Sequence, residues 1–136
     1  MKIAVRYYSK TGNTEKLANA ISKALGVKAL PITQPVNPDT EVLFLGSSVY
    51  GAGVANEVKA FILSLDKNIG SVVNFSSAAI SESTYKQVKK LVEAKGINMS
   101  EKEYHCRGRF TILHRGRPNE KDLKEAASFA KDFIDG

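Results

Sequence analysis

Short apolar runs alternate with helical stripes of apolar residues along the chain. The runs predict five strands, at Ile3–Tyr8, Val27–Ile32, Val42–Leu45, Val72–Phe75 and Glu103–Leu113. Apolar positions three and four residues apart predict helices between them, at Thr14–Leu25, Val54–Leu65, Tyr85–Val92 and Leu123–Ile134. Alternating strands and helices of this size favour an α/β fold with a parallel sheet covered by helices on both faces. Because crossover connections are right-handed, few topologies remain.

The composition is that of one ordinary globular domain. The chain has 136 residues, 43% of them hydrophobic and 25% charged, without a repeat or an internal linker, so we expect one domain over residues 1–136. Neither a secretory leader nor an apolar run of membrane-spanning length is apparent. The single cysteine, Cys106, cannot form an internal disulfide. These features predict a cytoplasmic protein.

The turn between the first predicted strand and the first predicted helix carries the most chemistry. It contains the hydroxyls of Ser9, Thr11 and Thr14, the carboxamide of Asn13, and Gly12. All four polar side chains can donate to phosphate oxygens. The start of the helix adds backbone N–H groups and the positive end of its dipole. Gly12 leaves room for a ligand and permits a positive φ. The turn therefore predicts a site for a phosphate dianion.

Other known phosphate loops do not fit this chain. A Walker-type loop requires a lysine after its second glycine, and the nearest approach, at 46–53, has none. The same stretch lacks the third glycine of a dinucleotide-binding fingerprint and follows a later strand. A phosphoacceptor receiver domain would have carboxylates where this chain has Ser9 and Ser47. A simpler alternative stays open, in which Asn13 or Thr14 only caps the helix.

Three segments that follow predicted strands should share one edge of the sheet. They are Ser9–Thr14, Gly46–Gly53 after the third strand, and Ser76–Ile80 after the fourth. Ligands of doubly wound sheets lie beyond the carboxyl ends of the strands, near the point where the strand order reverses. We therefore expect these three segments to converge on one ligand site.

These residues resemble the flavodoxin family over essentially the whole chain. The family's phosphate loop reads Ser/Thr-x-Thr-Gly-Asn-Thr directly after the first strand, and Ser9–Thr14 matches every fixed position. Leu45–Gly51 and Phe75–Ala78 resemble the family's second and third flavin loops, and the stretch from Cys106 into the last helix resembles small bacterial flavodoxin-domain proteins. The resemblance implies a three-layer αβα fold, a five-stranded parallel sheet of order 2-1-3-4-5, and FMN as cofactor.

The resemblance also implies which residues bind FMN. The phosphate would be held by Ser9, Thr11, Gly12, Asn13 and Thr14, with Lys10 at the variable position either beside the phosphate or solvated. The ring would be flanked, chiefly through backbone groups, by Ser47, Ser48, Val49, Tyr50, Gly51 and Ala52 and by Ser76, Ser77, Ala78 and Ala79, up to Ile80. Tyr50 is the candidate for stacking on the ring. We predict no metal site and no catalytic residue.

Two departures from the family change the expectation. The chain has no tryptophan, so the Trp-and-Tyr sandwich of many flavodoxins cannot form. Many flavodoxins are strongly acidic, whereas this chain has 20 Lys and Arg against 14 Asp and Glu, a net charge of +6. We hypothesise that the second reduction step has a less negative potential than in acidic flavodoxins, because a basic chain repels the reduced flavin less. A partner that recognises an acidic flavodoxin is not expected.

Basic residues are densest between Lys102 and Arg117, with Tyr104 and Phe110 among them. Nucleic-acid binding would require these charges on one face with the aromatic rings exposed for stacking. Alternation along a strand instead favours buried rings and a solvated or partner-docking edge, so we do not expect a nucleic-acid partner.

Three classes of function stay open at this point. The first is an electron carrier of the flavodoxin type, a monomer or weak dimer that serves a redox protein or a small-molecule acceptor. The second is an FMN-dependent oxidoreductase that acts on a bound quinone- or porphyrinogen-like substrate, or a flavodoxin-like subunit of another redox system, as in ribonucleotide reductase activation. The third is a flavin-free module that binds another phosphate ligand or docks through its basic edge.

Overall fold

The computed structural model describes residues 1–10, 12–50, 53–78, 84–107 and 118–136, without the side chains at 49, 50, 78, 106 and 107. In chain order the elements are β1 (Ile3–Tyr7), α1 (Asn13–Leu25), β2 (Ala29–Pro31), β3 (Val42–Tyr50), β4 (Gly53–Val54), α2 (Asn56–Ser64), β5 (Ser71–Ala78), α3 (Tyr85–Ala94), β6 (Asn98–Met99), β7 (Tyr104–Arg107) and α4 (Glu120–Asp135).

The strands form one sheet of order β2-β1-β3-β5-β6, and β7 also pairs with β5. Each of these pairs is parallel. β6 and β7 therefore share the fifth position, beside the fourth strand of the predicted order. The predicted order 2-1-3-4-5 is therefore confirmed, with β5 as the fourth strand and β6 and β7 together as the fifth. β4 is a short antiparallel addition to the end of β3.

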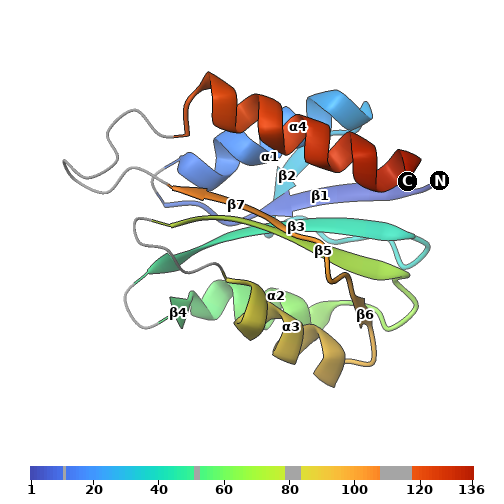
Figure 1. The fold of residues 1–136 in the computed structure, drawn as a ribbon. Helices are drawn as coiled ribbons and strands as arrows, with labels where there is room; N and C mark the ends of the chain where they lie inside the picture. Colours follow the sequence, from blue (N-terminus) through green and yellow to red (C-terminus); the bar gives the residue numbers. More distant parts are fainter. Residues whose placement is uncertain (11, 51–52, 79–83, 108–117) are drawn as a thin grey trace.

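Helices cover both faces of the sheet, which confirms the three-layer αβα architecture (Figure 1). α1 and α4 lie on one face, over strand residues such as Phe44 and Phe75. α2 and α3 lie on the other face, over the intervening strand residues such as Leu45 and Val72. Because successive strand residues point to opposite faces, a strand covered on both sides reads as a continuous apolar run in the sequence.

The strand boundaries differ from the prediction where strands pair beyond the apolar core. β3 continues past Leu45 to Tyr50, because Gly46–Ser48 pair with β5 and the last two residues pair with β4. The fifth predicted strand, Glu103–Leu113, begins as β7 at Tyr104, and its residues from 108 onward lie outside the described part of the chain. All four predicted helices are present. Among the described residues, none of the helices has the length and hydropathy that a membrane crossing requires.

Candidate functional site

The ends of β3 and β5 and the start of α1 bring one side chain from each predicted segment together. These side chains are Thr14 of the first segment, Ser48 of the second and Ser77 of the third. Thr14 Oγ1 is hydrogen-bonded to Ser48 Oγ and, at 3.0 Å, to Ser77 Oγ. The two serine Oγ atoms lie 3.1 Å apart. The predicted convergence of the three segments is confirmed.

We call Thr14, Ser48 and Ser77 the hydroxyl cluster. All three residues are buried, with exposed fractions of 0%, 6% and 2%. Each hydroxyl has one proton to donate, so three mutual hydrogen bonds use the proton of every member. Thr14 Oγ1 also lies 3.4 Å from the carbonyl oxygen of Ser47. The cluster therefore ties the start of α1 to the ends of β3 and β5, and the Thr14 hydroxyl is directed into the sheet.

Gly46 allows α1 to approach the sheet this closely. A Cβ atom at this position would lie 2.3 Å from the Phe75 ring and 2.9 Å from Thr14 Cγ2. Real Cβ atoms do not tolerate such distances, because a packed interior has no space to absorb them. The glycine just before Ser47 is thus required to seat the first turn of α1.

The N-cap residue of α1 makes no side-chain cap hydrogen bond. Gly12 occupies the N-cap position with φ at 88°, and Asn13 and Thr14 lie within the helix. The alternative in which Asn13 or Thr14 is the N-cap is therefore wrong. Ser9 Oγ accepts a hydrogen bond of 2.9 Å from the Gly12 N–H, which closes the turn. Because the first N–H groups of a helix have no intrahelical acceptor, this end of α1 offers backbone donors and a positive dipole.

Two tyrosines at the end of β1 link the loop to its neighbouring helices, and the sequence prediction did not include them. The Tyr7 hydroxyl donates to Glu15 Oε2 at 2.9 Å, and the Tyr8 hydroxyl donates to Glu57 Oε2 at 2.8 Å. The hydrogen bond from Tyr8 lowers the pKa of Glu57, and the charge of Lys10 lowers it further. Burial, followed by the interaction with Glu15, raises the pKa of Tyr7.

Ser47 and Ser76 are neighbours across β3 and β5, and both are fully buried. Ser47 Oγ donates a hydrogen bond of 3.0 Å to Thr84 Oγ1, at the start of α3. Ser76 Oγ has no hydrogen-bond partner among the described residues. A buried hydroxyl without a partner carries a desolvation cost, so Ser76 is a polar group for which a ligand or water would supply the missing bond.

The structure describes only some of the remaining predicted site residues. Ser9 is half-buried and Lys10 is exposed at the loop, and Asn13 is 5% exposed in the first turn of α1. Thr11, Gly51, Ala52, Ala79 and Ile80 lie outside the described residues. Val49, Tyr50 and Ala78 are described through their backbone alone, so the stacking of Tyr50 on a ring stays a prediction.

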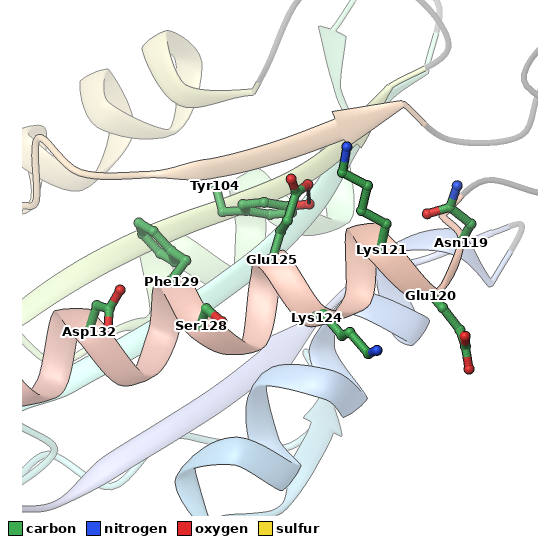
Figure 2. A pocket seen from close by; sticks show the side chains of 9 residues that line it. All are labelled: Tyr104, Asn119, Glu120, Lys121, Lys124, Glu125, Ser128, Phe129 and Asp132. Atoms are coloured by element: carbon green, nitrogen blue, oxygen red, sulfur yellow. Dashed lines mark hydrogen bonds between the residues drawn. The ribbon is translucent and has the colours of Figure 1, made fainter.

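A separate open groove of about 1030 Å³ runs along α4 beside β7 (Figure 2). It is lined by Tyr104 of β7 and by side chains of mixed charge from α4 and its cap, including Lys121, Lys124, Glu125 and Asp132. None of the predicted site residues lines this groove. We therefore place the candidate site at the start of α1 and not at the groove. No group of three or more His, Cys, Asp and Glu side chains among the described residues could hold a metal ion.

Comparison with known proteins supports the predicted fold. No family model matches the chain. An uncharacterised protein of Methanocaldococcus jannaschii is 28% identical over 149 residues, which cover 98% of this chain and 99% of the relative.

The solved structures that are similar to this chain include flavodoxins. A flavodoxin from the domain Archaea has a TM-score of 0.78 and 19% identity, and the match covers 99% of this chain and 97% of that one. A two-electron reduced flavodoxin of Megasphaera elsdenii has a TM-score of 0.65 and 25% identity, with 95% and 98% coverage. The resemblance drawn from the Ser9–Thr14 motif is thereby confirmed as a likeness of fold.

Proposed function

Since this chain has the fold of the flavodoxins, we propose that it binds FMN and transfers electrons to a redox partner. The observation that carries the proposal is the start of α1, where an N-terminus without a side-chain cap meets the hydroxyl cluster. Backbone donors, a positive dipole and polar side chains at one point suit a phosphate dianion. No other segment of the described chain combines these features with a phosphate-loop sequence.

Some residues of the site are proposed to bind the phosphate of FMN, and others to hold the loop in place. Ser9, Thr11 and Asn13 are proposed to bind the phosphate oxygens through their side chains, together with backbone N–H groups of the first turn. Thr14 contributes chiefly by seating that turn, because its hydroxyl is engaged in the hydroxyl cluster. Lys10 is exposed at the loop and adds positive charge beside the proposed phosphate.

The ring is proposed to lie between 47–52 and 76–79, beside the buried ends of β3 and β5. The unpartnered hydroxyl of Ser76 supports a polar group of the ligand on this side. When bound, FMN supplies one- and two-electron transfer, and the protein contributes orientation and electrostatics. The chain's own residues hold the phosphate, fix the ring-flanking segments and set the local charge.

Purification with spectroscopy tests the proposal directly. The protein should be yellow, and denaturation should release FMN in near-stoichiometric amount. A colourless preparation that also fails to bind added FMN would remove the proposed function and leave the flavin-free module as the remaining class.

A matched pair of variants tests the phosphate assignment. Ser9→Ala combined with Thr11→Ala should weaken FMN binding by about 100-fold or more, because each of the two lost hydrogen bonds to a charged group costs about 1.5–3 kcal/mol. Riboflavin, which lacks the phosphate, should bind both proteins equally. Ser128→Ala on α4 is the control and should change neither ligand. Equal losses for FMN and riboflavin in the double variant would contradict this assignment.

A kinetic assay distinguishes an electron carrier from an oxidoreductase. A carrier should pass electrons between a reductase and a protein acceptor. Its rate of quinone reduction should not saturate as the quinone concentration rises. Saturable turnover of a quinone or porphyrinogen by the isolated holoprotein would favour the enzyme alternative.

A further inference from the structure

Two residues at the start of α3 form hydrogen bonds to the two ends of the ring-flanking segment at 47–52. At one end, Ser47 of β3 donates to Thr84 Oγ1 at 3.0 Å. At the other end, the Val54 N–H of β4 donates to Gln87 Oε1 at 2.7 Å. Thr84 and Gln87 are three residues apart, so they lie on the same side of one helical turn.

Thr84 is held in place by hydrogen bonds to β3 and β5. It is 1% exposed, and its hydroxyl accepts hydrogen bonds from Ser47 and from Asn74 Nδ2, both at 3.0 Å. It also donates to Asn74 Oδ1 at 3.3 Å. A hydroxyl can donate one hydrogen bond and accept two, so the capacity of Thr84 is filled. Buried networks with every group satisfied are rigid, because any displacement leaves a polar group unpaired.

Gln87 is an exposed residue that reaches back to the β3–β4 pair. The fit is close: a Cβ added to Gly53 would lie 2.5 Å from the Gln87 side-chain amide. Gly53 also has φ at 138°, which other residues rarely adopt. Gly53 pairs with Tyr50, and Val54 pairs with Val49, so Gln87 holds the strand that returns from the ring-flanking segment.

We propose that Gln87 is a positioning residue for the flavin ring. Together with Thr84, which is hydrogen-bonded to Asn74 of β5, it fixes Gly53 and Val54 of β4 relative to β5. The two ring-flanking segments would thereby keep a constant separation. This inference rests on the proposed function, because the ring is the group whose binding depends on that separation.

Three variants test it in the whole protein. Gln87→Leu removes the acceptor for the Val54 N–H and preserves the size and helical character of the residue. Gln87→Glu retains carboxyl oxygens that can accept the bond. Lys86→Leu, the neighbouring exposed position in the same turn, is the matched control.

The first measurement needs no flavin. Amide hydrogen exchange at Val54 should become about tenfold faster or more in Gln87→Leu, because the bond that protects it is lost. Exchange at Leu43 and Phe44, in the middle of β3, should stay unchanged. Gln87→Glu and Lys86→Leu should both match the wild type. Unchanged exchange at Val54 in Gln87→Leu would overturn the positioning role whether or not FMN binds.

The second measurement compares FMN with riboflavin. Gln87→Leu should weaken both by about five- to tenfold, because both carry the ring and one hydrogen bond is lost. Gln87→Glu should restore both affinities. A loss confined to FMN, or no loss for either ligand, would overturn the inference. If the wild type binds neither flavin while Val54 responds as expected, the proposed function fails and the ring assignment fails with it, whereas the contact between α3 and β4 stands.

Discussion

At the residue scale, the side chains around the proposed phosphate loop are held by partners from other elements. Tyr8, which follows β1, donates a hydrogen bond to Glu57 of α2, and Arg6 of β1 donates to the loop after β2. These contacts fix where charge lies around the site. They also make separate predictions, because each can be removed without touching the proposed ligand-binding groups.

Tyr8→Phe should raise the pKa of Glu57 toward its ordinary value. In the wild type the hydrogen bond from Tyr8 is the first cause of the lowered pKa. A carboxylate with a lowered pKa in the folded state stabilises the fold above its unfolded pKa, and that contribution is lost as pH falls through the folded value. NMR titration of the Glu57 carboxyl carbon measures the change. An unmoved pKa of Glu57 in Tyr8→Phe would contradict the assignment.

Arg6→Leu should lower the free energy of unfolding by about 1–3 kcal/mol, because one buried and two partly buried carbonyl groups lose their donor. The guanidinium donates to the carbonyl oxygens of Gln34 at 3.2 Å, Pro35 at 2.7 Å and Val5 at 3.0 Å. Burial also lowers the pKa of Arg6, so holding the charge there has a cost. Urea unfolding measures the balance. A variant as stable as the wild type would show that this cost cancels the three hydrogen bonds.

At the element scale, the four helices differ in how they begin. α4 has a capping box, in which Asn119 Oδ1 accepts from the Asp122 N–H at 3.0 Å and Asp122 Oδ2 accepts from the Asn119 N–H at 2.8 Å. The N-cap residues of α1, α2 and α3 make no side-chain cap hydrogen bond. Among these three helices, α1 is the one that begins at the proposed phosphate loop, where its positive dipole would favour an anion.

Asn119→Ala should destabilise the protein by about 1 kcal/mol, since it removes one half of the capping box of α4. FMN affinity should be unaffected, because α4 carries none of the proposed ligand-binding residues. Chemical denaturation measures the stability, and Lys121→Ala in the same turn serves as the control, with an expected change within about 0.5 kcal/mol. A stability equal to that of the wild type would contradict the contribution assigned to the cap.

Most of the elements could be predicted from the sequence, because the period of apolar residues is a local signal. Leu17 and Ile21 lie a helical turn apart, and Val42–Leu45 forms a continuous run. β4 was missed, since two residues carry no periodicity and pair only because β3 continues beyond its apolar part. β6 was missed because it also has only two residues and therefore shows no periodicity.

The meeting of the three predicted segments could be predicted, and their contacts could not. The rule for parallel sheets predicted that these segments share one edge of the sheet, and Thr14, Ser48 and Ser77 meet there. The Thr14 hydroxyl contacts the ends of the strands, and the Gln87 side chain accepts a hydrogen bond from the Val54 N–H. Both contacts depend on how the helices pack on the sheet, which no local sequence pattern predicts. Thr84 carried no signal either, because a threonine before a helix reads as a simple cap.

At the scale of the whole molecule, charge is the property that most separates this chain from acidic flavodoxins. The net charge is +6, and Lys2 forms an ion pair with Asp39. Positive charge that is not neutralised locally creates a field that favours anions near the surface. A reduced flavin is such an anion.

The potential of the second reduction step should therefore be less negative than in acidic flavodoxins, by an amount on the order of tens of millivolts per nearby unit charge. Stepwise reductive titration of the holoprotein measures this potential. Added salt should make the potential more negative here, because screening weakens the stabilisation by surface cations. A strongly low-potential hydroquinone couple that does not respond to salt would contradict the electrostatic interpretation.

The hydroxyl cluster has a consequence for the order in which the chain folds. Its members are separated by 34, 63 and 29 positions along the sequence. Closing such long loops costs chain entropy, so these contacts become favourable only after both parallel crossovers have docked. The proposed phosphate site should then form among the last events of folding. In pulse-labelling experiments, amides at the start of α1 should gain protection no earlier than those in the middle of β5.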